Sequence, residues 1–364
     1  MRILKRILLT LILLVILMAG SSAAYIYYQQ DELEQAVIKE INKRLKSTIN
    51  IGDIEFSVIK NFPYASLDLN NILTIDAFQE DTLCKIEVLQ LKFNALDLYN
   101  KIYIIEELTL KNGFASIYYK DSMPNYEIWR STKDSSQEVN TDFGLENISL
   151  ENFKIAYATD DIQSIFVNNK SQLQLSIKNG RTEINLEGDI TTEKLILDGI
   201  NHLPSKKINI NGNIVIDTLV LNIKSTIDLR DIQIDLDFES TDKAMTVKVN
   251  TSEFELEPTL KLIPKNYLSV LEGYELQGKS AIKFNYISDQ QKEAFINVDF
   301  DLKEGYIKGK DLYFDMNETS LKGSYSNGKQ RTDASTEIKL VDIQFTTNGE
   351  LVQANATIQG IENP

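Results

Sequence analysis

Cysteine and histidine are almost absent from this chain of 364 residues. The single cysteine, Cys84, excludes an intramolecular disulfide and a cysteine-clustered zinc or iron–sulfur site, and its phase with Ile86 and Val88 predicts packing in the core. The single histidine, His202, excludes motifs that pair two histidines, and its turn-like sequence NHLPS predicts an exposed side chain. We therefore expect no catalytic residues, no metal site and no cofactor, and predict that the protein is not an enzyme.

Positive charge is also scarce. Lys and Arg number 38 against 53 Asp and Glu, which gives a formal net charge of −15. This charge disfavours binding to polyphosphate chains, so we expect no nucleic acid among the partners. Apolar residues make up 43% of the chain and charged residues 25%, a composition that favours a folded protein over a disordered one.

Charged residues are missing from residues 7–28 (ILLTLILLVILMAGSSAAYIYY). At about 1.5 Å per residue, a helix of this length spans roughly the 30 Å of a bilayer core. Arg2, Lys5 and Arg6 precede the stretch, and basic residues keep their side of a membrane segment in the cytoplasm. We therefore expect residues 1–28 to form a cytoplasmic stub and a single-pass transmembrane anchor, with the bulk of the chain beyond the membrane.

The same stretch permits a second interpretation, a cleaved signal peptide. Ser22, Ala23 and Ala24 follow the most apolar part, and small residues of this kind precede a cleavage site. Tyr25 and Tyr27 favour a retained anchor, because aromatic residues gather where a spanning helix meets the membrane interface.

Residues 29–48 carry a helical pattern. Leu33, Val37, Ile41 and Leu45 recur at every fourth position, which places them on one stripe of a helix. The pattern predicts a short amphipathic helix after the membrane anchor.

Beyond residue 48 the apolar residues recur at every second position, which is typical of β-strands. We predict a mainly β fold, a long curled antiparallel sheet that forms an apolar groove. The clearest candidates for the floor of that groove are Ile232, Ile234, Leu236 and Phe238. Periodicity alone leaves open whether the chain covers this face itself, as in a sandwich or barrel, or whether an apolar ligand covers it.

The β region divides into segments. We expect a first β-groove segment over residues 49–130, a loop or linker over 131–141 (STKDSSQEVNT), and a second β-groove segment over 142–364, which ends in mid-pattern and so belongs to a short protein or to a fragment of a longer one. Residues 258–271 predict a helical segment broken at Pro264.

Two local patterns predict interruptions of the strands. Apolar, any, apolar, any, Asn recurs in five copies, and each predicts a strand that runs into a hairpin, because Asn and Gly tolerate left-handed backbone. The copies begin at Leu67, Leu108, Ile148, Leu175 and Ile208. Within residues 84–93 the apolar phase slips by one residue, which predicts a bulge or a change of buried face.

Residues 273–280 (GYELQGKS) match the P-loop pattern, which taken as a string indicates nucleotide binding and an enzyme. A P-loop needs a helix after its glycine-rich turn, so that the helix N-terminus faces the phosphates. Here Ile282, Phe284 and Tyr286 alternate as in a strand. We therefore expect a turn that leads into a strand.

The strand face opposite the proposed groove floor carries several acidic residues, which could indicate a calcium-binding site. They are Asp231, Asp235, Asp237 and Glu239. A calcium loop curls its backbone round the ion, whereas apolar residues at alternate positions indicate an extended chain. We expect a solvated strand face.

The order of features resembles the AsmA-like family of bacterial envelope proteins. The resemblance rests on the N-terminal anchor and helix, on Phe62-Pro63 within FSVIKNFPYASLDLNNI, and on LQLKFNALDLYNKIYIIEELTLKNGFASIYY over residues 89–119. It continues through Asn125-Tyr126 and ISLENFKIAY over residues 148–157 to DFDLKEGYIKGKDL and LKGSYSNGK near the C-terminus. The pattern covers essentially the whole chain and contains no catalytic signature.

The resemblance implies a location and a function. It implies a protein of the Gram-negative inner membrane, cytoplasmic at its N-terminus and otherwise periplasmic, related to bridge-like lipid-transfer proteins. Its β-groove would hold or pass phospholipid or another envelope lipid in support of outer-membrane lipid homeostasis or biogenesis. The alternative is a non-enzymatic envelope scaffold that binds protein partners through its sheet edges and aids outer-membrane protein assembly.

Overall fold

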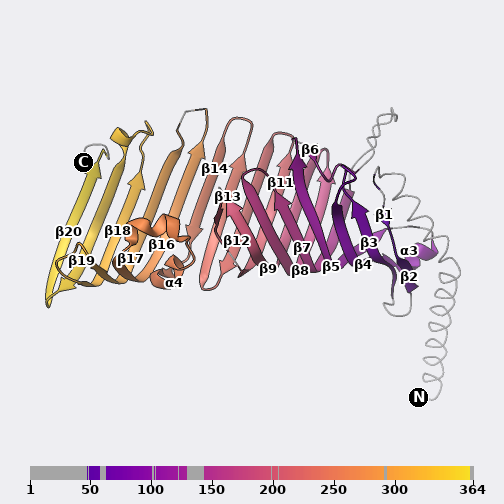
Figure 1. The fold of residues 1–364 in the computed structure, drawn as a ribbon, viewed down its shortest axis with the longest axis horizontal. Helices are drawn as coiled ribbons and strands as arrows, with labels where there is room; N and C mark the ends of the chain where they lie inside the picture. Colours follow the sequence, from indigo (N-terminus) through magenta and orange to yellow (C-terminus); the bar gives the residue numbers. More distant parts are fainter. Residues whose placement is uncertain are drawn as a thin grey trace, which may run out of the picture. The chain divides into compact units, whose positions relative to one another are not determined.

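A computed structural model describes residues 47, 49–57, 63–100, 102, 104–121, 123–128, 143–197, 199–203, 205–290 and 293–360. The fold is mainly β, and twenty strands belong to one large sheet (Figure 1). The predicted anchor, the predicted helix over 29–48 apart from Ser47, and the predicted linker over 131–141 lie outside the described residues. No helix in the described part of the chain is both long and apolar enough to cross a membrane.

The chain divides into two compact units, Met1–Ser176 (unit 1) and Ile177–Pro364 (unit 2). The division falls within a strand, β8 (Ile162–Lys178). The segments expected from the sequence, 49–130 and 142–364, stay predictions.

The described part of unit 1 contains strands of very different lengths and one short helix. They are β1 (Ile49–Asn50), β2 (Asp53–Ser57), β3 (Tyr64–Ile75), β4 (Thr82–Asn94), α3 (Ala95–Tyr99), β5 (Ile105–Lys120), β6 (Met123–Pro124), β7 (Phe143–Ala158) and most of β8. The pairs β3–β4 and β4–β5 are antiparallel, whereas β5 and β7 are parallel, with Leu108 opposite Ile148. A wholly antiparallel sheet was therefore a wrong expectation at this pair, where the chain crosses over before β7 begins.

Unit 1 has a core of its own. Leu67 and Leu69 on β3 are fully buried, and Phe93 on β4 is 3% exposed. The cluster consists of Phe56, Ala65, Leu67, Leu69, Ile72, Ile86, Leu91, Phe93, Ala95, Leu98 and Phe153. Asn94 caps α3, because its side chain accepts a hydrogen bond from the Leu96 N–H, and the cap turns the chain from β4 into the helix.

The sequence pattern predicts that each repeated asparagine ends a strand, and for most copies this prediction is wrong. Asn71, Asn112 and Asn152 have φ values of 54°, 50° and 49° and lie inside β3, β5 and β7. The copy that begins at Ile208 also continues, through β11 (Lys206–Asp217). Only Asn179, followed by Gly180, forms the expected turn, between β8 and β9 (Arg181–Leu197). A type I′ hairpin turn needs positive φ at both central positions, and Asn179 at 51° and Gly180 at 78° supply it.

Asn112 and Asn152 change which side chains their strands bury. They lie on the paired strands β5 and β7, and the Asn152 Nδ2 donates to the Asn112 Oδ1 at 2.9 Å. A residue with left-handed backbone shifts by one position the alternation of side chains between the two faces of a strand. On β7 the side chains that face the core are therefore even-numbered before Asn152, as at Leu150, and odd-numbered after it, as at Phe153. Gly113 is required beside this contact, because a Cβ there would lie 2.6 Å from the Lys85 carbonyl oxygen.

The predicted phase slip in residues 84–93 is confirmed on β4. Ile86 is buried, and so are Leu91 and Phe93, which lie an odd number of residues further along. The partner strand β3 changes its buried face at the same place, since the buried Ile72 lies opposite Ile86 and the buried Leu67 lies opposite Leu91 in an unbroken register. The strand therefore exchanges its buried face near its middle.

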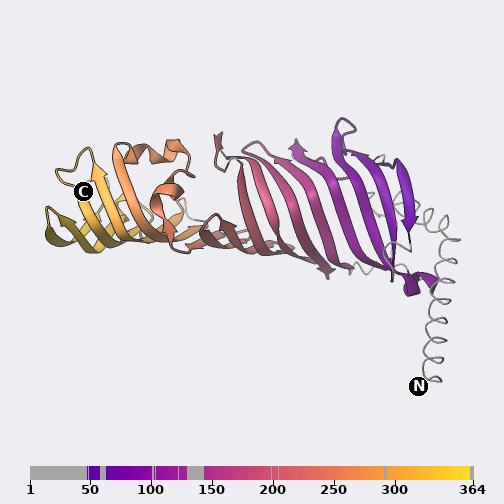
Figure 2. The same ribbon diagram turned by 90° about the horizontal axis from the view of Figure 1, so that it is seen from below.

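Unit 2 is an antiparallel array. Its elements are β9 (Arg181–Leu197), β10 (Ile200–Asn201), β11, β12 (Val220–Leu229), β13 (Ile232–Ser240), β14 (Met245–Thr251), β15 (Phe254–Glu255), α4 (Leu256–Leu260), η1 (Lys265–Leu271), β16 (Tyr274–Ser288), β17 (Phe295–Gly309), β18 (Met316–Ser326), η2 (Asp333–Ser335), β19 (Glu337–Thr347) and β20 (Glu350–Gln359). The predicted helical segment is confirmed as two short helices separated at Pro264, and they lie to one side of the strands (Figure 2).

A buried polar cluster ties the turn after β3 to β5 in unit 1. The fully buried carboxylate of Asp76 accepts hydrogen bonds from the Tyr118 hydroxyl at 2.5 Å and the Glu80 N–H at 3.0 Å. Burial alone would raise the pKa of Asp76, but these hydrogen bonds outweigh it and the pKa is lowered. The hydrogen bond to Asp76 raises the pKa of Tyr118 to about 12. Asn125, also fully buried, donates to the Ser116 carbonyl oxygen at 2.8 Å.

We expect Asp76→Asn to destabilise the protein by about 1–3 kcal/mol at neutral pH, because it weakens a buried hydrogen-bonded group. The folded-state pKa of Asp76 is lower than the unfolded one, so its stabilisation is present above the unfolded pKa and lost as pH falls through the folded pKa. Urea denaturation at a series of pH values should therefore show a smaller loss of stability on acidification in the variant. Parallel pH profiles for the two proteins would contradict this role.

Candidate functional site

The four residues predicted for the groove floor lie together on one face of β13. Ile232 is 7% exposed, and Ile234, Leu236 and Phe238 are partly buried. The neighbours Gln233, Asp235 and Glu239 are exposed. The alternation expected from the sequence is present along this strand, and it defines an apolar side and a polar side.

The apolar side of β13 continues across unit 2. Residues directly opposite each other in antiparallel strands have side chains on the same face, so the register traces rows across the sheet. The row through Leu236 contains Leu186, Gly212, Ser225, Leu236, Val249, Phe284, Val298, Tyr325, Ile338 and Ile358. The row through Phe238 contains Ile184, Ile214, Ile223, Phe238, Val247, Tyr286 and Ile296. We call the side of the sheet that carries these rows the apolar face.

The opposite face of unit 2 is polar along the same strands. The row through Asp235 contains Glu187, Asn211, Thr226, Asp235, Asn250, Lys283, Asp299, Ser324, Lys339 and Thr357. The Thr226 hydroxyl donates to the Asp235 carboxylate at 2.8 Å, and Asp237 lies opposite Lys224 and Lys248. No group of His, Cys, Asp or Glu in the described residues is arranged to hold a metal ion.

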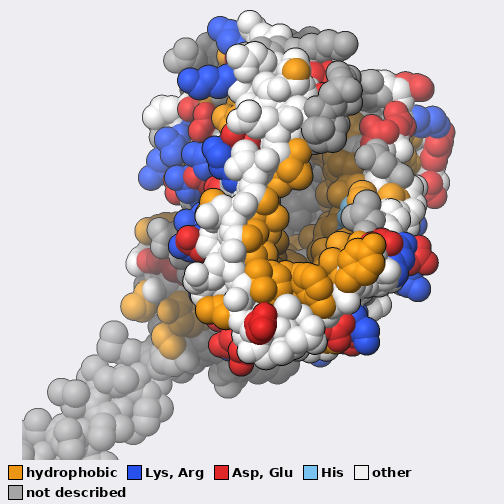
Figure 3. Space-filling model, turned by 90° about the vertical axis from the view of Figure 1, so that its left-hand side faces the viewer, with side chains coloured by type: hydrophobic (Ala, Val, Ile, Leu, Met, Phe, Trp, Pro, Cys, Tyr) orange, Lys and Arg blue, Asp and Glu red, His pale blue; other side chains and the backbone are white. Residues whose placement is uncertain are grey.

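The apolar face is only half covered by its own chain. In the described part of unit 2 the buried apolar side chains are Leu229, Ile232, Phe254, Leu302 and Phe345. They form no buried cluster there, in contrast to the eleven-residue core of unit 1. Seen from the β20 end, unit 2 is hollowed, hydrophobic side chains line the hollow, and charged side chains gather on the outside (Figure 3).

His202 is partly buried, which corrects the expectation that it is exposed. Its ring centroid lies 5.7 Å from that of Tyr267 on η1, and its Nε2 is enclosed without a hydrogen-bond partner. The Tyr267 side chain is itself 53% exposed. The fold therefore uses the single histidine in an aromatic contact beneath the helical segment.

The P-loop match lies in a strand, as expected. β16 begins at Tyr274, directly after Gly273, and continues past Lys279 and Ser280 to Ser288. Gly278 has φ +124° at a register shift against β17, where a Cβ would lie 2.8 Å from the Gly305 Cα. The glycine therefore allows a β-bulge and does not form a phosphate cradle.

The charges around this bulge also oppose phosphate. The Lys279 Nζ lies 2.8 Å from a carboxylate oxygen of Glu304, which has φ 52° in the facing strand. A cavity of about 400 Å³ adjoins the bulge, and Glu255, Glu257 and Glu304 contribute to its lining. Three carboxylates would repel a triphosphate.

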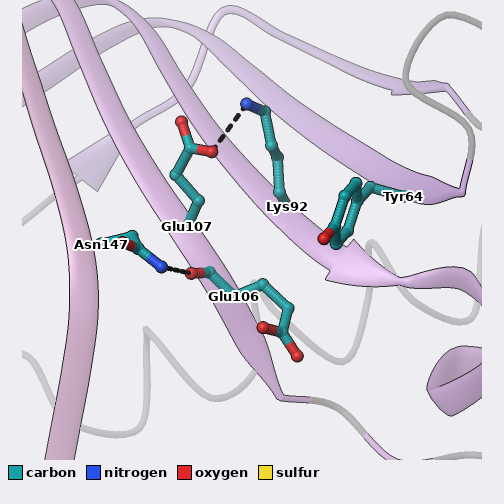
Figure 4. Close-up of a pocket in the computed structure, with 5 residues that line it drawn as sticks. All are labelled: Tyr64, Lys92, Glu106, Glu107 and Asn147. Atoms are coloured by element: carbon teal, nitrogen blue, oxygen red, sulfur yellow. Dashed lines mark hydrogen bonds and ion pairs between the residues drawn. The ribbon is translucent and has the colours of Figure 1, made fainter.

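A second hollow, in unit 1, is small and polar. Tyr64, Lys92, Glu106, Glu107 and Asn147 line a cavity of about 190 Å³ (Figure 4). The Lys92 ammonium lies 2.8 Å from the Glu107 carboxylate, and the Asn147 amide donates to the Glu106 carbonyl oxygen at 3.1 Å. Burial raises the pKa of Glu107, but the hydrogen bond from Lys92 outweighs it and the pKa is lowered. The lysine and the glutamate are therefore paired with each other within this cavity.

Cys84 packs beside the core of unit 1, as the sequence predicts. Burial raises the pKa of its thiol to about 11. The thiolate is the nucleophilic form, so this cysteine is unreactive at neutral pH.

Comparisons of the chain with models of protein families, with curated proteins and with solved structures find no match. The functional interpretation therefore depends on the chemistry of the apolar face.

We expect Lys279→Ala to change the unfolding free energy by no more than about 0.5 kcal/mol, because the exposed pair with Glu304 is the interaction that it removes. Isothermal titration with Mg-ATP should show no binding to either the variant or the parent protein. ATP binding by the parent that disappears in the variant would establish the nucleotide-site interpretation instead.

Proposed function

We propose that the protein holds or passes the acyl chains of envelope phospholipids along the apolar face of unit 2. The observation that carries the proposal is that row after row of apolar side chains crosses the strands of unit 2 while remaining half exposed. Exposed apolar area costs about 25 cal/mol per Å² in water, so a ligand that covers the face gains free energy over its whole length.

The chemistry of the face favours hydrocarbon chains over compact ligands. The row through Leu236 is mostly branched and aromatic side chains, and its polar groups are the hydroxyls of Ser225 and Tyr325. Small-molecule sites instead bring several polar groups together to orient their ligand. A face with polar groups so few and far apart suits a flexible chain that slides along it, with the polar headgroup left in water.

The location belongs to the same proposal. The uncharged residues 7–28 would anchor the chain in the bacterial inner membrane, and the basic residues before them would place the strands of both units in the periplasm. The resemblance to the AsmA-like family supports this arrangement and a role in outer-membrane lipid homeostasis or biogenesis. In this proposal the protein performs no covalent chemistry.

A second candidate function is an envelope scaffold that aids outer-membrane protein assembly. The observation in its favour is the side of β20 with which none of the described strands pairs, where Leu351 is 62% exposed. Sheet edges bind extended segments through backbone hydrogen bonds, without any lipid on the apolar face. The two candidates therefore differ in whether lipid contacts β13.

A photo-crosslinking side chain at 234, 236 or 238 should capture phospholipid in cells, because these positions lie on the apolar face. The same probe at 235 or 237 should not, because neighbouring residues of a strand point to opposite faces. Mass spectrometry of the crosslinked species checks the outcome. Absence of lipid adducts at all three apolar positions would favour the scaffold.

We expect Leu236→Asp to reduce co-purified phospholipid by about tenfold or more, because a desolvated carboxylate against hydrocarbon costs several kcal/mol. Since Leu236 is half exposed, water reaches the new charge in the lipid-free protein and folding is retained. The matched control is Ser324→Asp on the polar face, where Asp299 and Lys339 are its neighbours. Lipid counted by mass spectrometry should fall in the first variant alone; equal lipid in both would remove β13 from the lipid path.

A further inference from the structure

The helical segment of unit 2, residues 256–271, is built as a flap. It leaves the sheet after β15 and returns to it at β16, and these two strands are paired, with Phe254 opposite Ser280. Both ends of the flap are therefore attached at one place in the sheet. Its tip lies elsewhere, because Tyr267 on η1 contacts His202, which follows β10.

The tip of the flap reaches a part of the sheet that is several strands away from its attachment. His202 is held on β9, since its N–H donates to the Leu195 carbonyl oxygen at 2.8 Å. In the order of pairing, β11, β12, β13 and β14 lie between β9 and β16. The flap therefore bridges these strands, and it lies to one side of them (Figure 2).

The burial of side chains on the bridged strands indicates which face is covered. Leu229 on β12 and Ile232 on β13 lie opposite each other and are 6% and 7% exposed. Asp228 and Gln233 also lie opposite each other, on the polar face, and both are exposed. The cover therefore lies on the apolar face, at this end of the strands. Toward the other end, the row through Phe238 is only partly buried.

No hydrogen bond within the described residues joins the flap to the strands that it bridges. The hydrogen bonds of residues 256–271 stay inside the flap or reach the residues next to it, as when the Thr259 hydroxyl donates to the Glu255 carbonyl oxygen at 2.6 Å. The contact at the tip adds none, because the His202 Nε2 has no partner in the described part of the chain. Tyr267 is 53% exposed even in this contact. The tip can therefore separate from the sheet without breaking a hydrogen bond.

We propose that the flap opens and closes over this end of the apolar face, and that the contact of Tyr267 with His202 is the latch that holds it closed. Opening uncovers the apolar side chains around Leu229 and Ile232, so that an acyl chain can reach them, and closing covers that chain again. The proposal rests on the proposed function for the identity of the ligand. The movement itself can be measured without lipid.

Thiol labelling of the full chain in detergent tests the movement. Ile232→Cys, in a protein whose Cys84 is replaced by alanine, places a thiol beneath the flap, and N-ethylmaleimide reaches it while the flap is open. Adding Tyr267→Ala removes the latch and should raise the labelling rate about three- to tenfold, as followed by mass spectrometry. Tyr267→Phe keeps the ring and should leave the rate unchanged.

The matched control is Phe345→Cys, at a position that is also 7% exposed but lies on β19 and stacks on Phe314. Its labelling rate should not respond to Tyr267→Ala. Leu229→Cys serves as a second thiol beneath the flap if circular dichroism shows that Ile232→Cys folds poorly. An unchanged rate beneath the flap, an equal rise at Phe345→Cys, or an equal rise with Tyr267→Phe would each overturn the proposal.

Reconstitution separates the flap from the proposed function. In vesicles of phosphatidylethanolamine and phosphatidylglycerol, a photo-crosslinking side chain at 236 should capture phospholipid faster when Tyr267→Ala is present, by about the factor found in the labelling. Labelling that responds to Tyr267→Ala without any lipid capture would leave the flap and remove the lipid function. Lipid capture without a labelling response would do the reverse.

Discussion

The structure depends on one constraint, that successive side chains of an extended strand point to opposite faces. When apolar residues occupy every second position of many paired strands, the sheet acquires one face that water wets poorly, and something must cover it. Unit 1 meets this need with a buried cluster centred on Leu67 and Leu69. Unit 2 leaves its apolar face half exposed. This difference between the units is the basis for the proposal that unit 2 binds an apolar ligand.

The sequence predicts the alternation well and its interruptions poorly. Apolar periodicity predicts β13 and its sidedness, and proline chemistry predicts the break at Pro264, because both depend on the segment alone. LTLKNG and LSIKNG are nearly the same peptide, yet Asn112 in the first stays within a strand and Asn179 in the second turns a hairpin. What separates them is the neighbouring strand: β7 pairs with β5 beside Asn112 and contributes Asn152 to the contact.

Polar residues that matter to the fold were also hard to find in the sequence. Asp76 follows a strand, as many solvated turn residues do, and its burial arises because Tyr118, 42 residues away, returns beside it. For the candidate site, a different property could not be predicted from the sequence. The residues of the apolar face can be predicted from the periodicity of the sequence. Their partial exposure cannot, because it depends on whether other parts of the chain pack over them, and no local pattern shows this. The proposed lipid function therefore depends on the incomplete burial of the apolar face, and the proposed membrane anchor depends on the uncharged residues 7–28.

The plain connectivity of unit 2 has a consequence for how such a protein changes length. Apart from the two-residue strands β10 and β15, each strand there pairs with the next strand along the chain, so each hairpin depends on the two beside it and not on a distant core. Architectures of this kind behave as nearly one-dimensional arrays, whose stability is a sum over adjoining units. Gain or loss of one hairpin preserves strand direction and the sidedness of every other strand. Heritable variation can thus lengthen or shorten the apolar face in steps of two strands while leaving its chemistry unchanged.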